Sequence, residues 1–340
     1  MAGTAGDELA LSEGAAGGLR RSGSGRRDIG VALVLLVVLA AAVLRPLLRD
    51  LLDQPAVAHW ATIFVAIAIQ AMPFLVLGVV ISAAIAAFVP PDLLPRLLPR
   101  QPAVAVPTAA MAGAVLPGCE CGSVPIAGRL VTRGAPAAAA LTFLLSAPAI
   151  NPVVLVATAV AFPGQPEVVG ARFLASLLAA IAVGLVWSRF GRDEWLGRAR
   201  KRYEDDGPPL SVFAATAQHD LLHAGGFLIF GAATAATLQT VVPRGVLDSV
   251  AGSGILAALA LGLLAVLMAI CSEADAFIAA SLTQFSMSSR LAFMVVGPMV
   301  DVKLIALQAG TFSGRFAARF APLSFAAAIG SSLVIGWWLL

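Results

Sequence analysis

All of the cysteines in this chain lie in two short windows that also carry acidic side chains. The residues, in chain order, are Cys119, Glu120, Cys121, Cys271, Glu273 and Asp275. Thiolates bind soft or borderline ions such as Zn(II), Cu(I) or trivalent arsenic, and carboxylates bring the charge that a cation needs. We therefore predict a site that binds a soft metal or metalloid. The alternative is that the thiols pack as small apolar groups in tight turns.

The spacing of the first pair of cysteines requires an irregular backbone. Cys119 and Cys121 are two residues apart, which on a regular helix would turn their side chains about 200° from each other. Pro117 and Gly118 come directly before them, and proline interrupts helices. Both sulfurs can then reach one site, and Cys271 would supply a third.

The two windows belong to two copies of one longer pattern. Adding 150 to the residue number relates the copies without a gap. The matched pairs are Cys121 with Cys271, Leu141 with Leu291, Phe143 with Phe293, Pro148 with Pro298, and Asn151 with Asp301. Interrupted apolar segments at matching positions of two halves are the best sequence pointer to the binding site of a transporter.

Several polar residues stand inside or beside apolar runs, where an ionised group is costly unless it faces a cavity or a partner. Glu273 and Asp275 are predicted as ligands or proton-relay groups, whereas Lys303 is predicted to form a structural pair with Asp301 or Asp275. Asn151 is expected to stabilise a broken helix. The residues predicted to shape or gate the broken segments are Pro117, Gly118, Pro125, Pro148, Asn151, Pro298, Asp301 and Lys303.

The composition places the chain in lipid. Of its 340 residues 59% are hydrophobic and 12% are charged, and the mean hydropathy is +0.93. A soluble domain cannot hide so much apolar surface from water. Many apolar runs reach the length of about 20 residues that crosses the hydrocarbon, so we expect an all-α polytopic membrane protein with about 9 to 11 membrane segments.

Composition also divides the chain. The predicted parts are a disordered basic tail (1–28), a first membrane helix (29–48), a first repeat (60–188), a cytoplasmic basic loop (189–213) and a second repeat (214–340). A signal peptide is the alternative for the first apolar run, but no convincing small-residue cleavage site precedes Arg45.

The basic residues predict the orientation. The arginines of the tail place the N-terminus in the cytoplasm, at the cytoplasmic (inner) membrane. If residues 103–131 turn back as a hairpin, Arg133 and the basic loop also fall inside; a full crossing would put that loop outside. Each repeat then crosses an odd number of times, so the repeats are inverted and the hairpin tips meet near the midplane. Arg133 and Ser288 are expected on opposite sides.

Other functional classes are less favoured. His219 and His223 share one helix face at a spacing that can hold a metal, but an interfacial histidine pair is the favoured interpretation. No Gly-x-x-x-x-Gly-Lys-Ser/Thr motif occurs, so no nucleotide partner is expected. The basic residues lie in loops and the tail, which excludes a nucleic-acid footprint. We expect no cofactor and no enzymatic activity; a membrane thiol enzyme using Cys119 and Cys121 is the remaining alternative.

The motifs resemble a known family. Residues 119–125 and 146–152 are similar to the UPF0718 (DUF318) bacterial permeases, which include ArsP, an exporter of trivalent organoarsenicals. Residues 271–277 and 297–303 look most like the YcgR branch of that family. The usual first motif of the family is Cys-Ser-Cys-Ser, and Glu120 and Gly122 replace its serines here. The added carboxylate moves the expected cargo toward a divalent ion.

The resemblance implies a permease or secondary transporter for a soft metal or metalloid, either a divalent metal such as zinc or a trivalent arsenical. Members of the YcgR branch are often encoded beside a small DUF1980 subunit, and some are regulated with zinc. The resemblance therefore also implies an alternative, a membrane subunit of a two-component complex with a DUF1980-type partner that supplies substrate binding.

Overall fold

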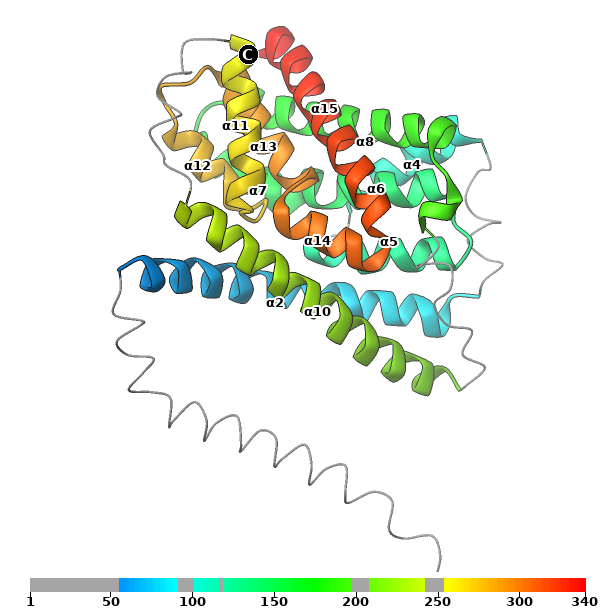
Figure 1. The fold of residues 1–340 in the computed structure, drawn as a ribbon. Coiled ribbons are helices and arrows are strands. Elements are labelled where there is room, and N and C mark those ends of the chain that lie inside the picture. The colour runs from blue at the N-terminus through cyan, green and yellow to red at the C-terminus, as the bar shows by residue number, and fades with distance from the viewer. Residues whose placement is uncertain (1–54, 91–100, 116–118, 197–207, 242–253) are drawn as a thin grey trace, which may run out of the picture. The chain divides into compact units, whose positions relative to one another are not determined.

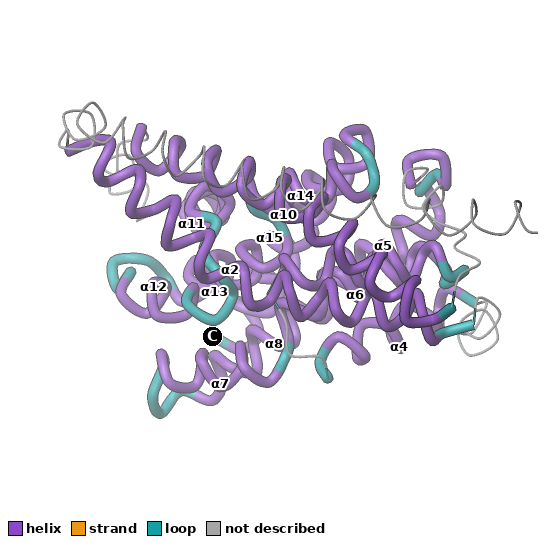
Figure 2. The backbone as a smooth tube through the Cα atoms, turned by 90° about the horizontal axis from the view of Figure 1, so that it is seen from below, coloured by secondary structure: helices purple, strands orange, loops and turns teal. Residues whose placement is uncertain are grey.

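The computed structural model describes residues 55–90, 101–115, 119–196, 208–241 and 254–340. These ranges contain helices joined by loops and no strand (Figure 2). Among them, 6 spans are long and apolar enough to cross a membrane, when the interrupted helices Ala137–Ala161 and Met287–Thr311 are each counted as one. The prediction of an all-α polytopic membrane protein is confirmed. The predicted tail and first membrane helix, and the turn residues Pro117 and Gly118, lie outside the described residues.

The two halves contain the same elements in the same order. The first half holds α2 (Pro55–Phe88), α4 (Pro102–Gly113), α5 (Glu120–Thr132), α6 (Ala137–Ile150), α7 (Pro152–Ala161) and α8 (Pro166–Phe190). After the short helix η1 (Asp193–Leu196), the second half holds α10 (Pro209–Val241), α11 (Gly254–Met268), α12 (Asp275–Ser281), α13 (Met287–Met299), α14 (Val302–Thr311) and α15 (Gly314–Leu339). The repeat boundaries stay a prediction, although the helices that open the repeats begin a few residues earlier than expected.

Equivalent helices run in opposite directions. In Figure 1 the colours run from left to right along α2 and from right to left along its counterpart α10, and the end of α8 lies against the start of its counterpart α15, where Trp187 packs on Phe316. Arg133 donates a hydrogen bond to the carbonyl of Ala86 near the end of α2, whereas Ser288 lies against Gly336 near the end of α15. The two positions therefore lie at opposite ends of the helices, as inverted repeats require.

The segment before the first break is a hairpin. Helix α4 has 12 residues, which rise only about 18 Å and cannot cross about 30 Å of hydrocarbon. Its Val106 lies with Thr142 against Gly184, and its Gly113 lies against Ser146. Helix α4 thus runs in the same direction as α6. Helix α5 leads back to the start of α6, so α4 and α5 are antiparallel limbs of one hairpin.

The broken helices end where a polar side chain caps the next segment. Asn151 accepts a hydrogen bond from the Val154 amide at 3.1 Å, at the start of α7. Asp301 accepts one from the Leu304 amide at 2.6 Å, at the start of α14. The sequence places the first interruption near Pro148, but Pro148 still lies inside α6. The break falls at the cap because the orphan amides of a helix start need an acceptor there.

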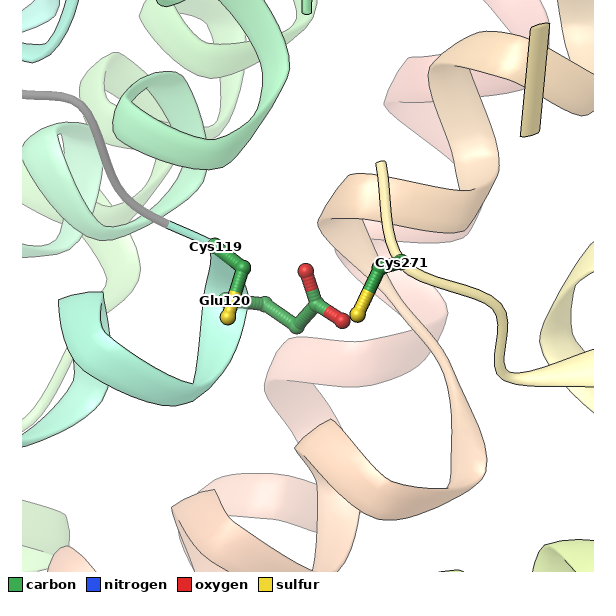
Figure 3. A group of neighbouring side chains, drawn as sticks. All are labelled: Cys119, Glu120 and Cys271. Atoms are coloured by element: carbon green, nitrogen blue, oxygen red, sulfur yellow. The ribbon is translucent and has the colours of Figure 1, made fainter. Parts of the chain in front are cut away.

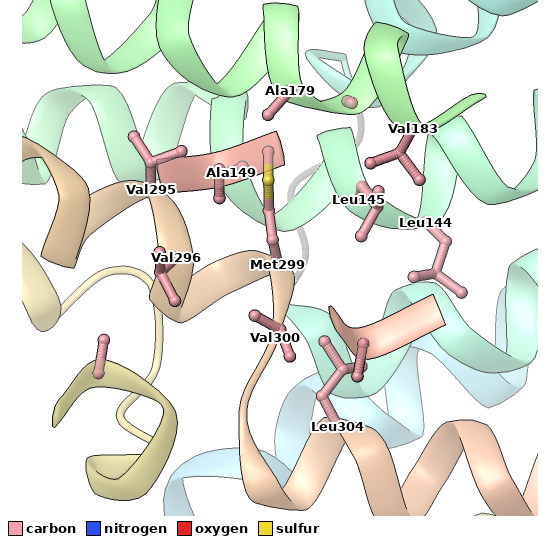
Figure 4. Packing of buried hydrophobic residues seen from close by; sticks show 14 of the residues in the cluster. Leu144, Leu145, Ala149, Ala179, Val183, Val295, Val296, Met299, Val300 and Leu304 are labelled. Atoms are coloured by element: carbon pink, nitrogen blue, oxygen red, sulfur yellow. The ribbon is translucent and has the colours of Figure 1, made fainter. Parts of the chain in front are cut away.

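The broken helices form the centre of the fold. In the apolar 18-residue stretch of the broken pair α13–α14, 83% of the residues are buried, compared with 28% in that of α2 and 33% in that of α10. Figure 4 shows Met299 and Val300 of the second break packed among Leu144, Leu145 and Ala149 of α6. Apolar side chains of α2 and α10 point outward, where lipid is the solvent that suits them.

Candidate functional site

The two hairpin tips bring ligand atoms from both halves together. Cys119 stands at the start of α5 with an extended backbone (φ −86°, ψ 175°), and Glu120 opens the helix. Cys271 lies in the turn between α11 and α12. One ligand atom from each of Cys119, Glu120 and Cys271 lies within 4.8 Å of the others, and all three residues are buried. In Figure 3 the Glu120 side chain reaches from α5 toward Cys271.

The third thiol lies next to this group. Cys121 is buried in the first turn of α5, two residues after Cys119. All three cysteines are free. The sequence predicts Cys121 as a ligand beside Cys119 and Cys271; in the structure the carboxylate of Glu120 completes the tight group, with Cys121 adjacent to it.

A lysine from the second half neutralises the first tip. The Lys303 ammonium lies 2.6 Å from Oε1 of Glu120 and 3.5 Å from Oδ2 of Asp301. It also lies 3.9 Å from the sulfur of Cys271. The predicted pair with Asp301 is therefore present, but the shortest contact is with Glu120. Lys303 does not pair with Asp275, the other partner that the sequence suggested.

The backbone before the second tip is shaped for this lysine. Ala269 follows the end of α11 with a φ of +46°, a left-handed conformation that costs a non-glycine residue about 1–2 kcal/mol. Its carbonyl accepts a hydrogen bond from Lys303 at 2.9 Å. Helix α10 can lie close to the same lysine because Gly231 has no side chain to meet the Lys303 backbone.

An arginine from the first half neutralises the second tip. Arg172 of α8 is completely buried. It donates to Oδ2 of Asp275 at 2.8 Å and to the Ser272 carbonyl at 3.0 Å, and its other terminal nitrogen donates to the Thr158 hydroxyl at 2.8 Å. The sequence reading missed this residue, although an arginine within the apolar run from Val168 to Trp187 is a signal for a buried functional or paired charge.

The two ion pairs are reciprocal. Glu120 on the tip of the first half is held by Lys303 of the second, and Asp275 on the tip of the second half is held by Arg172 of the first. A buried charge costs several kcal/mol unless it is paired. Each half therefore neutralises the charge that the other carries into the centre.

The centre still carries more negative than positive groups. The ionisable side chains here are Glu120, Glu273, Asp275, Asp301, Arg172 and Lys303. Within the part of the chain that the structure describes, the carboxylate oxygens Oε2 of Glu120, Oε2 of Glu273 and Oδ1 of Asp275 are buried with neither a hydrogen bond nor an ion-pair contact, whereas Oε1 of Glu120 and Oδ2 of Asp301 contact only Lys303. Carboxylate oxygens beside thiols can accept protons or bind a cation.

The histidine pair lies elsewhere. His219 and His223 stack on each other near the start of α10, and Nε2 of His223 lies 3.0 Å from the Gly310 carbonyl oxygen. The group of three close metal-ligating residues found in the described ranges is that of Cys119, Glu120 and Cys271. Among the described residues the histidines are not part of such a group, and their interfacial location stays a prediction.

Buried thiols and carboxylates between two inverted helical repeats define a membrane protein of the permease class. The comparisons give the family. Residues 56–337 match the model of the ArsP_1 family, described as predicted permeases, and the chain belongs to this family. The recognition of a UPF0718-type permease from the sequence motifs is thereby confirmed.

Two curated relatives are similar over most of their length. The UPF0718 protein YcgR of Bacillus subtilis is 36% identical over 262 residues, which cover 75% of this chain and 89% of that protein. A "Putative two-component membrane permease complex subunit" of Streptococcus mutans is 33% identical over 282 residues, which cover 81% of this chain and 94% of that protein. No solved structure matches the chain.

Proposed function

We propose that the chain is a secondary transporter that moves a soft metal or metalloid cation through the site between its hairpin tips. The observation that carries this proposal is the buried group of Cys119, Glu120 and Cys271, whose ligand atoms come from both halves and lie within 4.8 Å of one another. A divalent metal such as zinc or a trivalent arsenical suits two thiolates and one carboxylate. The protein would lie in the cytoplasmic membrane and would not act as an enzyme.

The ammonium group of Lys303 gives the site a way to bind and release such a cargo. Lys303 contacts Glu120 at 2.6 Å, so a cation bound by this carboxylate would lie within a few ångströms of a like charge. Two positive charges so close repel each other strongly in a medium of low dielectric constant. Cargo binding therefore requires the ammonium to move away, and return of the ammonium favours release.

Binding and flux measurements test this proposal directly. Zinc and trivalent arsenite would be titrated separately into the purified protein, followed by flux in vesicles that contain it. Cys119→Ser and Cys271→Ser are expected to lower the affinity for the cargo by at least about tenfold, because each removes one soft ligand. Normal affinity and flux in both variants would show that the thiols only pack.

The variant Lys303→Met tests whether the Lys303 ammonium competes with the cargo or only supports the first hairpin tip. If the ammonium competes with the cargo, this variant binds zinc or arsenite more tightly than the wild type but releases it slowly, so flux falls while affinity rises. If the lysine only supports the tip, affinity and flux fall together. Detergent-solubilised protein that remains monodisperse is the control for folding.

A second candidate function is that of the membrane subunit in a two-component permease. It is favoured by the similarity to the Streptococcus mutans protein, which is named as a putative subunit of a two-component membrane permease complex. The resemblance to the YcgR branch suggests a small DUF1980-type partner. Copurification of a protein encoded beside this chain, together with flux in liposomes only when both are present, would support it. Full flux by the chain alone would exclude it.

A further inference from the structure

A third buried ion pair lies well away from the hairpin tips. Arg129 of α5 and Asp220 of α10 are 7% and 5% exposed, and their nearest nitrogen and oxygen are 3.2 Å apart. The Asp220 carboxylate also accepts a hydrogen bond from Ser82 of α2 at 2.9 Å. One aspartate of the second half thus ties together two helices of the first.

This pair borders a small cavity. The lining residues are Pro125, Gly128, Arg129, Thr132, Asp220, His223, Ala224 and Thr311. They come from α5, α10 and α14. The cavity volume is about 20 Å³, which is room for about one water molecule and too little for a hydrated cation.

The helices that line the cavity also carry the ligand site. Helix α5 begins at Glu120 and reaches Arg129 nine residues later, a rise of about 13 Å. Helix α14 carries Lys303 near its start and Thr311 at its end, a rise of about 12 Å. The cavity therefore lies between the same two helices as the site, further along both.

The cavity is on the side that carries the basic residues. Arg133 follows α5 and bonds to the carbonyl of Ala86, and Arg189 lies in the last turn of α8. An excess of arginine and lysine marks the cytoplasmic side of a membrane protein. At this end α10 is fastened twice, by Asp220 to α5 and α2, and by His223 to the carbonyl of Gly310 in α14.

We infer that this cavity is the closed cytoplasmic access route to the ligand site, and that the Arg129–Asp220 ion pair is its gate. The inference rests on the proposed transport function. A cation passing between α5 and α14 has to part these helices from α10, and the buried ion pair is a charged contact that resists this movement. Opening exposes Gly128 and Thr311 to cytoplasmic water, and closing returns the occluded arrangement seen here.

Thiol labelling tests the route without the cargo. Thr311→Cys would be placed in a background with Cys119, Cys121 and Cys271 changed to serine, and the rate of reaction with a membrane-impermeant thiosulfonate would be measured in inside-out and right-side-out vesicles. We expect slow labelling in inside-out vesicles only. Labelling from the other side, or none from either side, would overturn the route.

Gate variants on the same reporter test the ion pair. Asp220→Asn is expected to speed labelling by at least about tenfold, because a buried pair that loses one partner no longer holds the helices together. The reversed pair Arg129→Asp with Asp220→Arg should return the rate to within about twofold of the original. An unchanged rate in Asp220→Asn, or no rescue by a folded reversed pair, would overturn the gate.

Arg290→Gln is the matched control. Arg290 is another partly buried arginine, and it donates to the carbonyls of Ala279 and Ala280 at the opposite end of the fold. Its loss should leave the labelling rate at Thr311→Cys unchanged; equal acceleration would mean that any loosening of the fold opens the cavity, which contradicts a specific gate. Because the serine background already lacks the thiol ligands, these outcomes do not depend on whether the proposed cargo is correct.

Discussion

The two hairpin tips are related by the repeat, yet they are held in different ways. At the first tip a lysine presents a single point charge to Glu120 and Asp301 and lies close to the sulfur of Cys271. At the second tip the Arg172 guanidinium donates hydrogen bonds to the Asp275 carboxylate, the Ser272 carbonyl and the Thr158 hydroxyl. A lysine can swing away on a flexible stem, whereas an arginine fork fixes geometry. On the proposed function, we therefore expect the first tip to move during transport and the second to act as an anchor.

The helices that follow the tips support the same division. Helix α5 has 13 residues, nearly all buried, and leads from Glu120 to the Arg129–Asp220 pair. Helix α12 has only seven residues, and its Phe277 is exposed. The first tip thus connects the ligand site with one end of the fold, and the second tip provides the opposing wall.

Loss of Lys303 should produce the largest effect. Lys303→Met leaves the buried carboxylates Glu120 and Asp301 without their cation, which should cost about 3–5 kcal/mol of the free energy of unfolding. Adding Glu120→Gln should recover part of that loss, because it removes one of the stranded charges. Unfolding of the detergent-solubilised protein by a denaturing detergent measures both. Equal stability of the single variant and the wild type would contradict the pairing.

Loss of Arg172 should cause the second-largest loss of stability. Arg172→Met strands one carboxylate rather than two, so the expected cost lies at the lower end of the range of about 3–5 kcal/mol. Asp275→Asn in the same chain should restore most of the stability. If Arg172→Met proves more harmful than Lys303→Met in the same unfolding assay, the number of stranded carboxylates does not set the cost, which contradicts this ranking.

The three cysteines should differ in how much their loss weakens cargo binding, according to their place in the site. Cys119→Ser and Cys271→Ser should each weaken cargo binding by about 10- to 100-fold, and Cys121→Ser by less, because Cys121 lies outside the tight group. Titration of purified protein with zinc or arsenite gives the ratios. A Cys121→Ser effect as large as that of Cys271→Ser would restore the three-sulfur site that the sequence predicts.

Substitutions of the capping residues of the broken helices should cause the smallest loss of stability. Asn151→Ala removes one capping acceptor and should cost about 1 kcal/mol. Asp301→Asn keeps a capping oxygen but removes a charge beside Lys303, so it should lower stability while leaving α14 intact. Unfolding measurements on both variants, with helix content from circular dichroism, test this. Loss of helix in Asp301→Asn would mean that its charge, and not its hydrogen bond, forms the cap.

Much of the fold follows from local pattern. Apolar runs give the long helices, and the capping residues Asn151 and Asp301 give the breaks because a helix start needs an acceptor. The offset of 150 is visible in the structure as well: α7 spans residues 152–161 and α14 spans 302–311. That Cys119 and Cys271 lie close together follows from the inverted repeat, and the distribution of arginine is what predicts the inversion.

The charge partners could not be predicted in this way. Lys303 meets Glu120, and Arg172 meets Asp275, only because the two halves interlock, and no repeat-equivalent charge marks either basic residue. Trp195 is similar: in the sequence it stands in a polar loop without a reason, but in the structure its ring faces Trp187 and lies 4.1 Å from the Arg319 guanidinium carbon. Such contacts depend on the arrangement of whole helices and not on the spacing of neighbours.

The reciprocal neutralisation of the tips also constrains how the protein is made. Lys303 is synthesised more than half a chain length after Glu120, so the first hairpin leaves the ribosome with an acid that has no counterion. We expect it to reach its final depth as a charged group only when the helix that carries Lys303 arrives. The centre of the protein should therefore assemble late, and neither half should be stable in the membrane when it is expressed alone.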